Sequence, residues 1–289
     1  MKKILAYVSP DKYASFFDVI VGYDAGADVV VPYCGISSGD MTDMLHNAVF
    51  TRHPKELKNT AVFIGGRDVG KCEELLEKSV DVLEKLPKPF RVSIAADPSG
   101  AYTTASACVA KINSALFNID GLNATVLAGT GPTGRRIGVL LAKEGCNVTV
   151  TSRKLEKAQE VCDEIRKRFD VKTKPVEILD ITKTGKAISE ADIVVSAGSE
   201  GIKLLPRDVW MKNKNIRVMA DVNAVPPYGI ENVDPDDDGR KIDGKIVFGA
   251  IALGNLKMKC HVEIIKRMFI DKNHVFDLKS IYKLTKDLL

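Results

Sequence analysis

Three glycines at G-x-G-x-x-G spacing, Gly129, Gly131 and Gly134, stand between an apolar stretch and an amphipathic one. The pattern predicts a strand over 124–128, which would bring the chain to the carboxyl edge of a sheet, and a helix over 135–144. In such a turn the first glycine allows a tight bend, the second lets backbone approach a pyrophosphate, and the third lets the helix pack closely. The motif and its context predict dinucleotide binding rather than a merely structural turn.

The residues at the end of the next predicted strand, 147–151, indicate which dinucleotide the chain binds. A site for NAD usually has Asp or Glu here to bind the ribose 2′-hydroxyl, but this chain has Thr151, Ser152, Arg153 and Lys154. A hydroxyl and two cations, with no carboxylate to repel a phosphate, suit the 2′-phosphate of NADP. The two cations could instead be solvated charges at a helix start. Because cations oppose the dipole there, a bound anion is the better explanation.

Three polar loops follow further predicted strands, at 97–104, 221–227 and 249–259. Their Pro, Gly, Asn and Asp residues are also what ordinary turns require, so turn formation alone could explain each loop. In open α/β sheets, ligands bind at the carboxyl ends of the strands. The loops are therefore candidates for substrate and cofactor contacts, with Asp97 and Asn223 among them.

Lys257 is harder to explain as a turn residue. The apolar spacing predicts a helix over 255–270, which would place Lys257 in its first turn, where a cation is disfavoured. Helical periodicity points Lys259 in a clearly different direction. Only one of the two lysines can therefore readily face a cleft.

Asp18 lies within the otherwise apolar face of the first predicted helix, between Phe17 and Val19. Its carboxylate could be solvated. Alternatively, a carboxylate beside Tyr23 and Asp24 at a strand–helix edge could bind a polar heterocycle.

Other kinds of catalytic site gain no support. No Ser-His-Asp, Cys-His or close carboxylate pair stands out. The six cysteines lack C-x-x-C spacing and the four histidines lack the spacing of metal ligands, so no metal is expected. A nicotinamide cofactor moves hydride, and the protein must then align donor and acceptor and exclude water.

Size and composition predict two domains in a chain of 289 residues, 45% of them hydrophobic. Forty-two Lys and Arg against 38 Asp and Glu give a net charge of +4, and the charges are interspersed, so no nucleic-acid partner is expected. The N-terminal apolar stretch is too short for a signal peptide, and no later one approaches a membrane span. We expect a cytoplasmic protein without a membrane partner.

Alternating apolar strands and helices predict an α/β fold with two domains and a cleft between them, one a doubly wound Rossmann-like NADP domain and the other a smaller parallel α/β domain. Residues 1–118 are the expected substrate domain, joined by the C-terminal helical segment 255–289, and residues 119–254 the NADP domain. The other expected strands are 4–8, 28–31, 60–64, 90–95, 176–179, 193–197, 216–220 and 246–251. The other expected helices are 16–23, 75–83, 102–117, 155–169 and 278–289.

Several long motifs, in one order along essentially the whole chain, resemble a known family. They are FDVIVGYDAGAD (17–28), AVFIGG (61–66), PFRVS (89–93), LAGTGPTG (127–134), RKLEKA (153–158), DVNAVPP (221–227) and FGAIALGNLKMK (248–259). In these motifs the chain resembles the NADP-dependent methylene-tetrahydromethanopterin dehydrogenases of one-carbon metabolism, a family that includes enzymes acting on methylene-tetrahydrofolate.

The resemblance implies direct hydride transfer from the bridging methylene of a reduced pterin carrier to NADP, which leaves a methenyl cation. Two nitrogens flanking the carbon delocalise the charge, so no general acid or base is obligatory. The resemblance also implies a homo-oligomer. It implies Lys257 as the catalytic residue beside the pterin, and Asp18, Tyr23 and Thr103 as substrate-binding residues. Asp97 and Asn223 of the polar loops are the other expected substrate-binding residues. The expected cofactor-binding residues are Gly129, Thr130, Gly131, Pro132, Thr133, Gly134, Ser152, Arg153, Lys154, Ala197 and Asn223.

Other functions stay open at this point. Val222 and Val225 stand where the family has Tyr and Gln, which leaves methanopterin or folate as the carrier. A dehydrogenase of a small alicyclic hydroxy acid would share the two-domain plan but requires a base, such as a lysine. An NADP-sensing or scaffold protein would bind the nucleotide without consuming a substrate.

Overall fold

The computed structural model describes residues 1–289, which form two compact units. The first unit comprises Met1–Thr103 and Met258–Leu288, and the second comprises Thr104–Lys257. The chain leaves the first unit within helix α4 (Ala101–Leu116) and returns to it within helix α9 (Ala250–Met268). None of the helices combines the length and apolar character needed for a transmembrane span.

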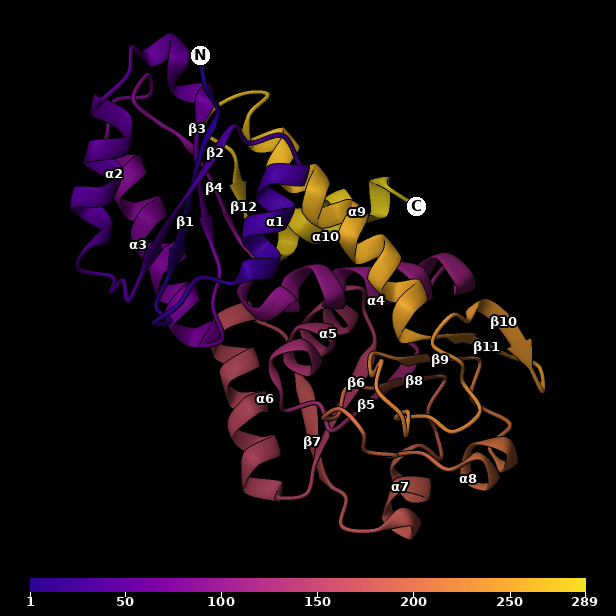
Figure 1. Ribbon diagram of the computed structural model, residues 1–289. Helices are drawn as coiled ribbons and strands as arrows, with labels where there is room; N and C mark the ends of the chain where they lie inside the picture. Colours follow the sequence, from indigo (N-terminus) through magenta and orange to yellow (C-terminus); the bar gives the residue numbers. More distant parts are fainter. The chain divides into compact units, whose positions relative to one another are not determined.

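The first unit is built on a five-stranded parallel sheet in the order β12-β4-β3-β1-β2. Helices α2 and α3 lie on one face of this sheet, and α1 and α10 lie on the other (Figure 1). Its central strand β3 is buried at every position, as its run of apolar residues predicts. The elements are β1 (Ile4–Ser9), α1 (Phe16–Asp24), β2 (Val29–Cys34), α2 (Met41–Phe50), the 3₁₀ helix η1 (Pro54–Asn59), β3 (Thr60–Ile64), α3 (Val69–Lys85), β4 (Ser93–Ala96), the 3₁₀ helix η2 (Pro98–Gly100), β12 (Val275–Phe276) and α10 (Leu278–Asp287).

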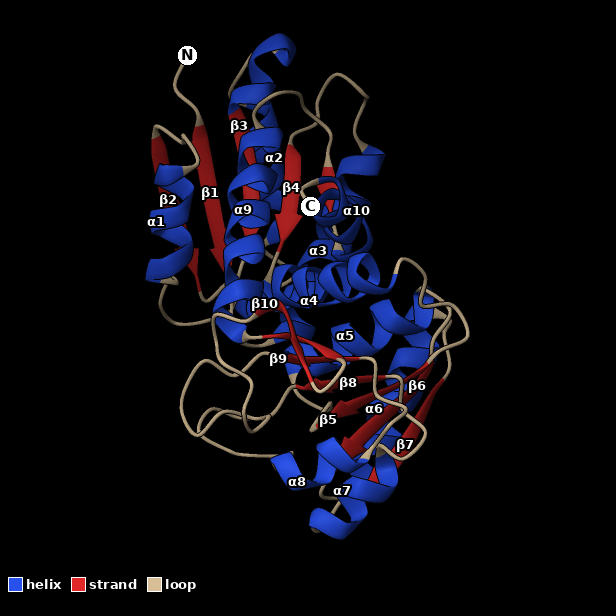
Figure 2. Ribbon diagram, turned by 90° about the vertical axis from the view of Figure 1, so that its right-hand side faces the viewer, coloured by secondary structure: helices blue, strands red, loops and turns tan.

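The second unit is built on a seven-stranded sheet in the order β10-β11-β9-β8-β5-β6-β7. All neighbours are parallel except the antiparallel pair β10 and β11 at one edge. Figure 2 shows α5 and α6 beside the strands at the opposite edge. The elements are β5 (Asn123–Leu127), α5 (Pro132–Lys143), β6 (Asn147–Ser152), α6 (Leu155–Phe169), β7 (Thr173–Glu177), α7 (Ile181–Ala187), β8 (Ile193–Ser196), α8 (Arg207–Lys212), β9 (Val218–Asp221), β10 (Asp238–Ile242) and β11 (Lys245–Phe248).

The fold class is as predicted, but helix α9 corrects one part of the sequence interpretation. The expected strand 246–251 ends at Phe248, and α9 begins at Ala250, so most of the expected loop 249–259 is helical. Gly249 and Gly254 suggested a loop, because glycine disfavours a helix interior by about 1 kcal/mol relative to alanine. Burial of neighbouring apolar side chains such as Leu253 and Leu256 overrides that preference.

The acidic run 234–238 contains a turn whose carboxylates have specific partners. Asp237 is buried, and its carboxylate accepts the Asp234 N–H at 2.8 Å and pairs with Arg240 at 2.6 Å. Asp238 begins β10 and forms an ion pair with Lys111 at 2.6 Å. The run therefore joins the edge of the sheet to α4 within the second unit.

We expect the free energy of unfolding to fall as the pH rises from about 9 toward about 12. Burial raises the pKa of the Cys72 and Cys146 thiols to about 12, from an ordinary value near 9. The unfolded chain then loses these protons at a lower pH than the folded chain, so alkali favours unfolding. Each thiol should contribute about 1 kcal/mol of this loss between pH 8 and pH 10. Urea unfolding at the two pH values measures it. The prediction is wrong if a Cys72→Ala, Cys146→Ala variant loses as much stability over this interval as the parent.

Candidate functional site

The glycine-rich turn lies at the carboxyl end of β5, as predicted. Ala128 directly follows the strand with a positive φ of 50°, and Gly131 is the N-cap of α5. Pro132 occupies the first helical position, where its missing N–H costs no helical hydrogen bond. The N-terminus of a helix carries unpaired N–H groups and a partial positive charge, which suit an anion.

The three glycines of the turn differ in what surrounds them. A Cβ on Gly134 would lie 2.7 Å from the Cα of Gly129, and one on Gly129 would lie 3.1 Å from the carbonyl oxygen of Val126. These two glycines therefore allow close packing of helix, turn and strand. A Cβ on Gly131 would meet nothing within 4 Å. The backbone at Gly131 thus borders open space at the helix N-terminus, and a pyrophosphate group fits there.

The end of β6 is hydrogen-bonded to this turn. The hydroxyl of Thr151 accepts the Ala128 N–H at 3.0 Å, and the Thr151 carbonyl accepts the Gly129 N–H at 3.0 Å. Arg153 and Lys154 follow and are exposed, and Lys154 is the N-cap of α6 without a side-chain cap. Two cations at the start of a helix oppose its dipole, and the first N–H groups of α6 have no side-chain cap. A bound 2′-phosphate would neutralise the cations and could accept hydrogen bonds from these N–H groups.

Two more predicted cofactor contacts lie at the carboxyl ends of neighbouring strands. Ala197 follows β8, and its N–H donates to the Leu127 carbonyl at 3.0 Å, which places it beside the end of β5. Asn223 follows β9 and is buried. Its side chain accepts the Val225 N–H at 2.9 Å and donates to the Pro227 carbonyl at 3.3 Å. In this structure the Asn223 side chain therefore shapes its own loop.

Asp221 holds the same loop from the end of β9. Its carboxylate accepts the Asn223 N–H at 3.1 Å and the Ile230 N–H at 2.8 Å. Burial raises the pKa of this carboxyl, and the hydrogen bonds from the loop act in the opposite direction. The loop 221–230 is thus fixed by a buried acid, which accounts for the aspartate that opens the DVNAVPP motif.

In the first unit, Asp97 and Thr103 are joined directly. The buried Asp97 carboxylate follows β4 and accepts the Thr103 hydroxyl at 2.5 Å. It also accepts the N–H groups of Tyr102 at 2.9 Å and of Thr103 at 3.1 Å, at the start of α4. Asp97 therefore fixes the start of the helix and the orientation of Thr103.

His261 brings these residues together with Asp18 and was not among the predicted site residues. Its Nε2 lies 3.9 Å from Asp18 Oδ1, and its Nδ1 lies 4.0 Å from Asp97 Oδ2. The ring is fully buried and stacks on Phe63 at 5.1 Å between centroids. We call Asp18, Asp97, Thr103 and His261 the histidine cluster. A signal was available in the sequence, since His261 lies one helical turn after Lys257.

Tyr7 and Gly65 extend the polar surroundings of Asp18. Burial and the nearby Asp18 charge raise the pKa of Tyr7 to about 12, so its hydroxyl stays protonated at neutral pH. A Cβ on Gly65 would lie 2.7 Å from the Tyr7 ring and 3.0 Å from Asp18 Oδ2. The glycine thus lets the backbone after β3 run directly beside these two polar groups.

The structure does not group Tyr23 with Asp18. Tyr23 is 49% exposed, and its hydroxyl accepts the Val30 N–H at 3.4 Å. Lys257 is half-buried while Lys259 is exposed, as two side chains that leave the helix in different directions would be. Contrary to the sequence prediction, Lys257 does not lie in the first turn of its helix, because α9 begins at Ala250, seven residues earlier.

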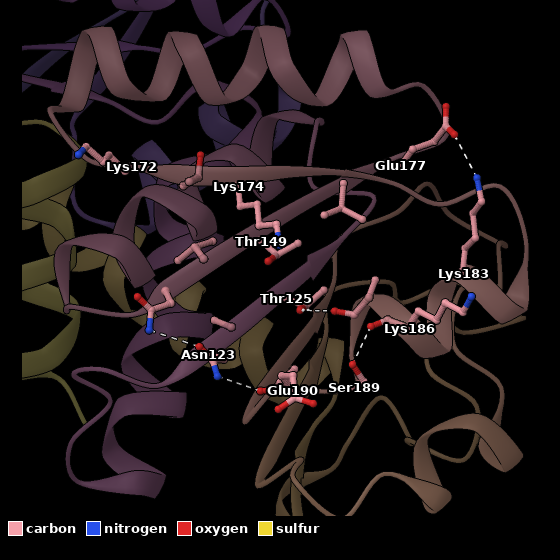
Figure 3. Close-up of a pocket in the computed structure, with 17 residues that line it drawn as sticks. Asn123, Thr125, Thr149, Lys172, Lys174, Glu177, Lys183, Lys186, Ser189 and Glu190 are labelled. Carbon is pink, nitrogen blue, oxygen red and sulfur yellow. Dashed lines mark hydrogen bonds and ion pairs between the residues drawn. The ribbon is translucent and has the colours of Figure 1, made fainter.

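A hollow of about 870 Å³ lies elsewhere, on a face of the sheet in the second unit (Figure 3). It follows the amino-terminal halves of β5 and β6, away from the glycine turn, where the seven-residue α7 leaves the sheet uncovered. Several of its polar groups already have partners. Thr125 donates to the Ala187 carbonyl, Asn123 to the Glu190 carbonyl and Ser189 to the Lys186 carbonyl. We assign this hollow no part in the site.

Comparisons with known proteins agree with the motifs. Residues 16–99 match the family described as methylene-tetrahydromethanopterin dehydrogenase, N-terminal, and residues 111–236 match shikimate / quinate 5-dehydrogenase. Two proteins of Methylorubrum extorquens each align over 99% of this chain and 99% of their own length. The "Bifunctional protein MdtA" is 40% identical over 288 residues, and the "NAD(P)-dependent methylenetetrahydromethanopterin dehydrogenase" is 29% identical over 300 residues.

Among solved structures, shikimate 5-dehydrogenase from Listeria monocytogenes, in complex with shikimate and NAD, has a similar fold. The match is 12% identical with a TM-score of 0.51, and it covers 98% of this chain and 96% of the other. At this identity the likeness concerns the fold alone.

Proposed function

The chain belongs to the methylene-tetrahydromethanopterin dehydrogenase family, and on this basis we propose that it oxidises methylene-tetrahydromethanopterin to methenyl-tetrahydromethanopterin with NADP. The glycine turn carries the proposal most directly, because its open position at Gly131 stands at the N-terminus of α5. Thr130 to Gly134 would contact the pyrophosphate through the backbone. Ser152, Arg153 and Lys154 would bind the 2′-phosphate, and Ala197 would lie beside the dinucleotide.

When bound, NADP accepts the hydride that leaves the bridging methylene carbon. The nitrogens beside that carbon share the positive charge that develops, so the residues of the chain need not move a proton. Their task is to hold the reduced pterin in one orientation and to keep water away. A buried set of carboxylate, hydroxyl and imidazole groups suits the polar edge of a pterin ring. We assign this role to the histidine cluster, and we propose Lys257, Tyr23 and Asn223 as further contacts of the pterin.

An activity assay tests the proposal. The protein is mixed with methylene-tetrahydromethanopterin and NADP, and the absorbance of NADPH is followed. We expect turnover with this pair and less with methylene-tetrahydrofolate or with NAD. Absence of turnover with both carriers and both nicotinamides would overturn the proposed function. Turnover with folate alone would correct the carrier.

We also propose that the enzyme is cytoplasmic and that it is a homo-oligomer, of which the second is implied by the family resemblance. Light scattering coupled to size-exclusion chromatography gives the mass directly, against 31.5 kDa for one chain. A mass equal to that of one chain at micromolar concentration would contradict the oligomer.

A further inference from the structure

Arg135 contacts the glycine turn from within α5, although it belongs to none of the predicted site residues. Its Nε donates to the carbonyl oxygen of Thr130 at 2.8 Å. Thr130 stands between the first two glycines of the motif. The Arg135 side chain, near the start of α5, thus contacts the glycine turn that precedes the helix.

This hydrogen bond fixes the orientation of one peptide plane. In a trans peptide the C=O and the following N–H point in opposite directions. Arg135 holds the Thr130 carbonyl toward its guanidinium, so the N–H of Gly131 is directed away from it. That N–H is one of the donors that the open helix N-terminus offers to an anion. Without the hydrogen bond, the plane of this peptide is freer to rotate, because Gly131 on its carboxyl side restricts φ very little.

Glu164 of α6 holds Arg135 in place. Its carboxylate forms an ion pair with the Arg135 guanidinium, and both side chains are partly buried, 24% and 34% exposed. The carboxylate also offsets a cation that would otherwise oppose the dipole at the start of α5. The planar guanidinium can serve the carboxylate and the carbonyl at once, which an ammonium cannot do with the same geometry.

We propose that Arg135, anchored by Glu164, is a positioning residue that sets the Gly131 N–H for the pyrophosphate of NADP. This inference rests on the proposed function, since it concerns the same cofactor site. The contacts run from Glu164 on α6 to Arg135 on α5, and from Arg135 to Thr130 in the glycine turn. Arg135 acts on the turn through the Thr130 carbonyl and needs no direct contact with the cofactor.

Titration calorimetry of Arg135→Met with two ligands tests the proposal. Adenosine 2′-monophosphate carries the 2′-phosphate but no pyrophosphate, whereas NADP carries both. We expect the Kd for NADP to rise about 10- to 100-fold, the value of one hydrogen bond to a charged group. The Kd for adenosine 2′-monophosphate should stay within about twofold. Arg135→Lys should resemble Arg135→Met, because the effect depends on geometry rather than on charge.

Lys143→Met is the matched control. Lys143 also lies on α5 and donates to a carbonyl of α6, that of Phe169 at 2.9 Å, but at the far end of the helix. Its loss should leave both affinities unchanged. The positioning role would be overturned if Arg135→Met bound both ligands more weakly by the same factor, or if Arg135→Lys bound NADP as tightly as the parent protein. Failure of the parent protein to bind NADP would instead reject the proposed function, so the two failures are distinguishable.

Discussion

Gly131→Ala should weaken NADP binding by about a hundredfold while the protein remains folded. The added methyl group meets no protein atom within 4 Å, and the residue's φ of −76° is ordinary for alanine. The methyl would, however, occupy the space that the proposed pyrophosphate needs beside the backbone. Loss of an N-cap glycine costs at most about 1 kcal/mol, so the free energy of unfolding should change little.

Gly134→Ala gives the contrasting result. Its methyl group would lie 2.7 Å from the Cα of Gly129 and 2.9 Å from the Gly129 carbonyl oxygen, and both are backbone atoms that cannot rotate away. Helix and turn must separate, which should destabilise the protein by about 1–3 kcal/mol. We expect this variant to lose both stability and NADP affinity.

Calorimetric titration with NADP and urea unfolding, applied to both variants, separate the two effects. The interpretation predicts loss of binding without loss of stability for Gly131→Ala, and loss of both for Gly134→Ala. Full NADP affinity in a folded Gly131→Ala protein would show that the pyrophosphate does not approach this position. The glycine turn would then be a structural connection only.

The glycine turn was predictable because its causes are local. The strand, the turn and the helix follow one another, and the closest contacts of Gly134 are with Gly129, five residues earlier. Helix α6 was predicted at its observed bounds, Leu155–Phe169, for the same reason. An amphipathic repeat and the turns at each end are all contained in that segment.

The histidine cluster could not be assembled from sequence, because its members come from distant parts of the chain. Asp18, Asp97 and Thr103 were predicted as separate contacts, and the sequence assigned His261 no role in the site. Only the packing of α9 within the first unit brings His261 to 3.9 Å from one carboxylate and 4.0 Å from the other. The local periodicity of a sequence does not predict contacts between residues so far apart in the chain.

Asn223 shows a different limit of sequence reasoning. An asparagine at the end of a strand is equally suited to a ligand contact and to a turn within its own backbone. In the structure the Asn223 side chain forms hydrogen bonds with the backbone of Val225 and Pro227, so it stabilises the turn of its own loop. The residue type was informative, but its partner was not determined by the sequence.

Replacement of Lys257 distinguishes the proposed pterin oxidation from oxidation of a small hydroxy acid, the alternative that requires a base. If Lys257 binds the pterin, Lys257→Met should lower kcat/KM by about 10- to 100-fold, mainly through KM, as expected for a lost charged hydrogen bond. Hydride transfer should stay measurable, since no proton has to move. If Lys257 were the base for an alcohol, kcat itself should fall by about 10²–10⁴-fold, and the ionisation seen in the pH profile should disappear.

Lys259→Met provides the matched control for this experiment. Lys259 has the same charge and lies on the same helix two residues later, but it is exposed whereas Lys257 is half-buried. Its replacement should change kcat/KM by less than about twofold, as for a solvated surface charge. An equal loss in both variants would mean that the general positive charge of α9 attracts an anionic substrate. Lys257 would then have no specific contact with the pterin, and the geometric basis for its role would be gone.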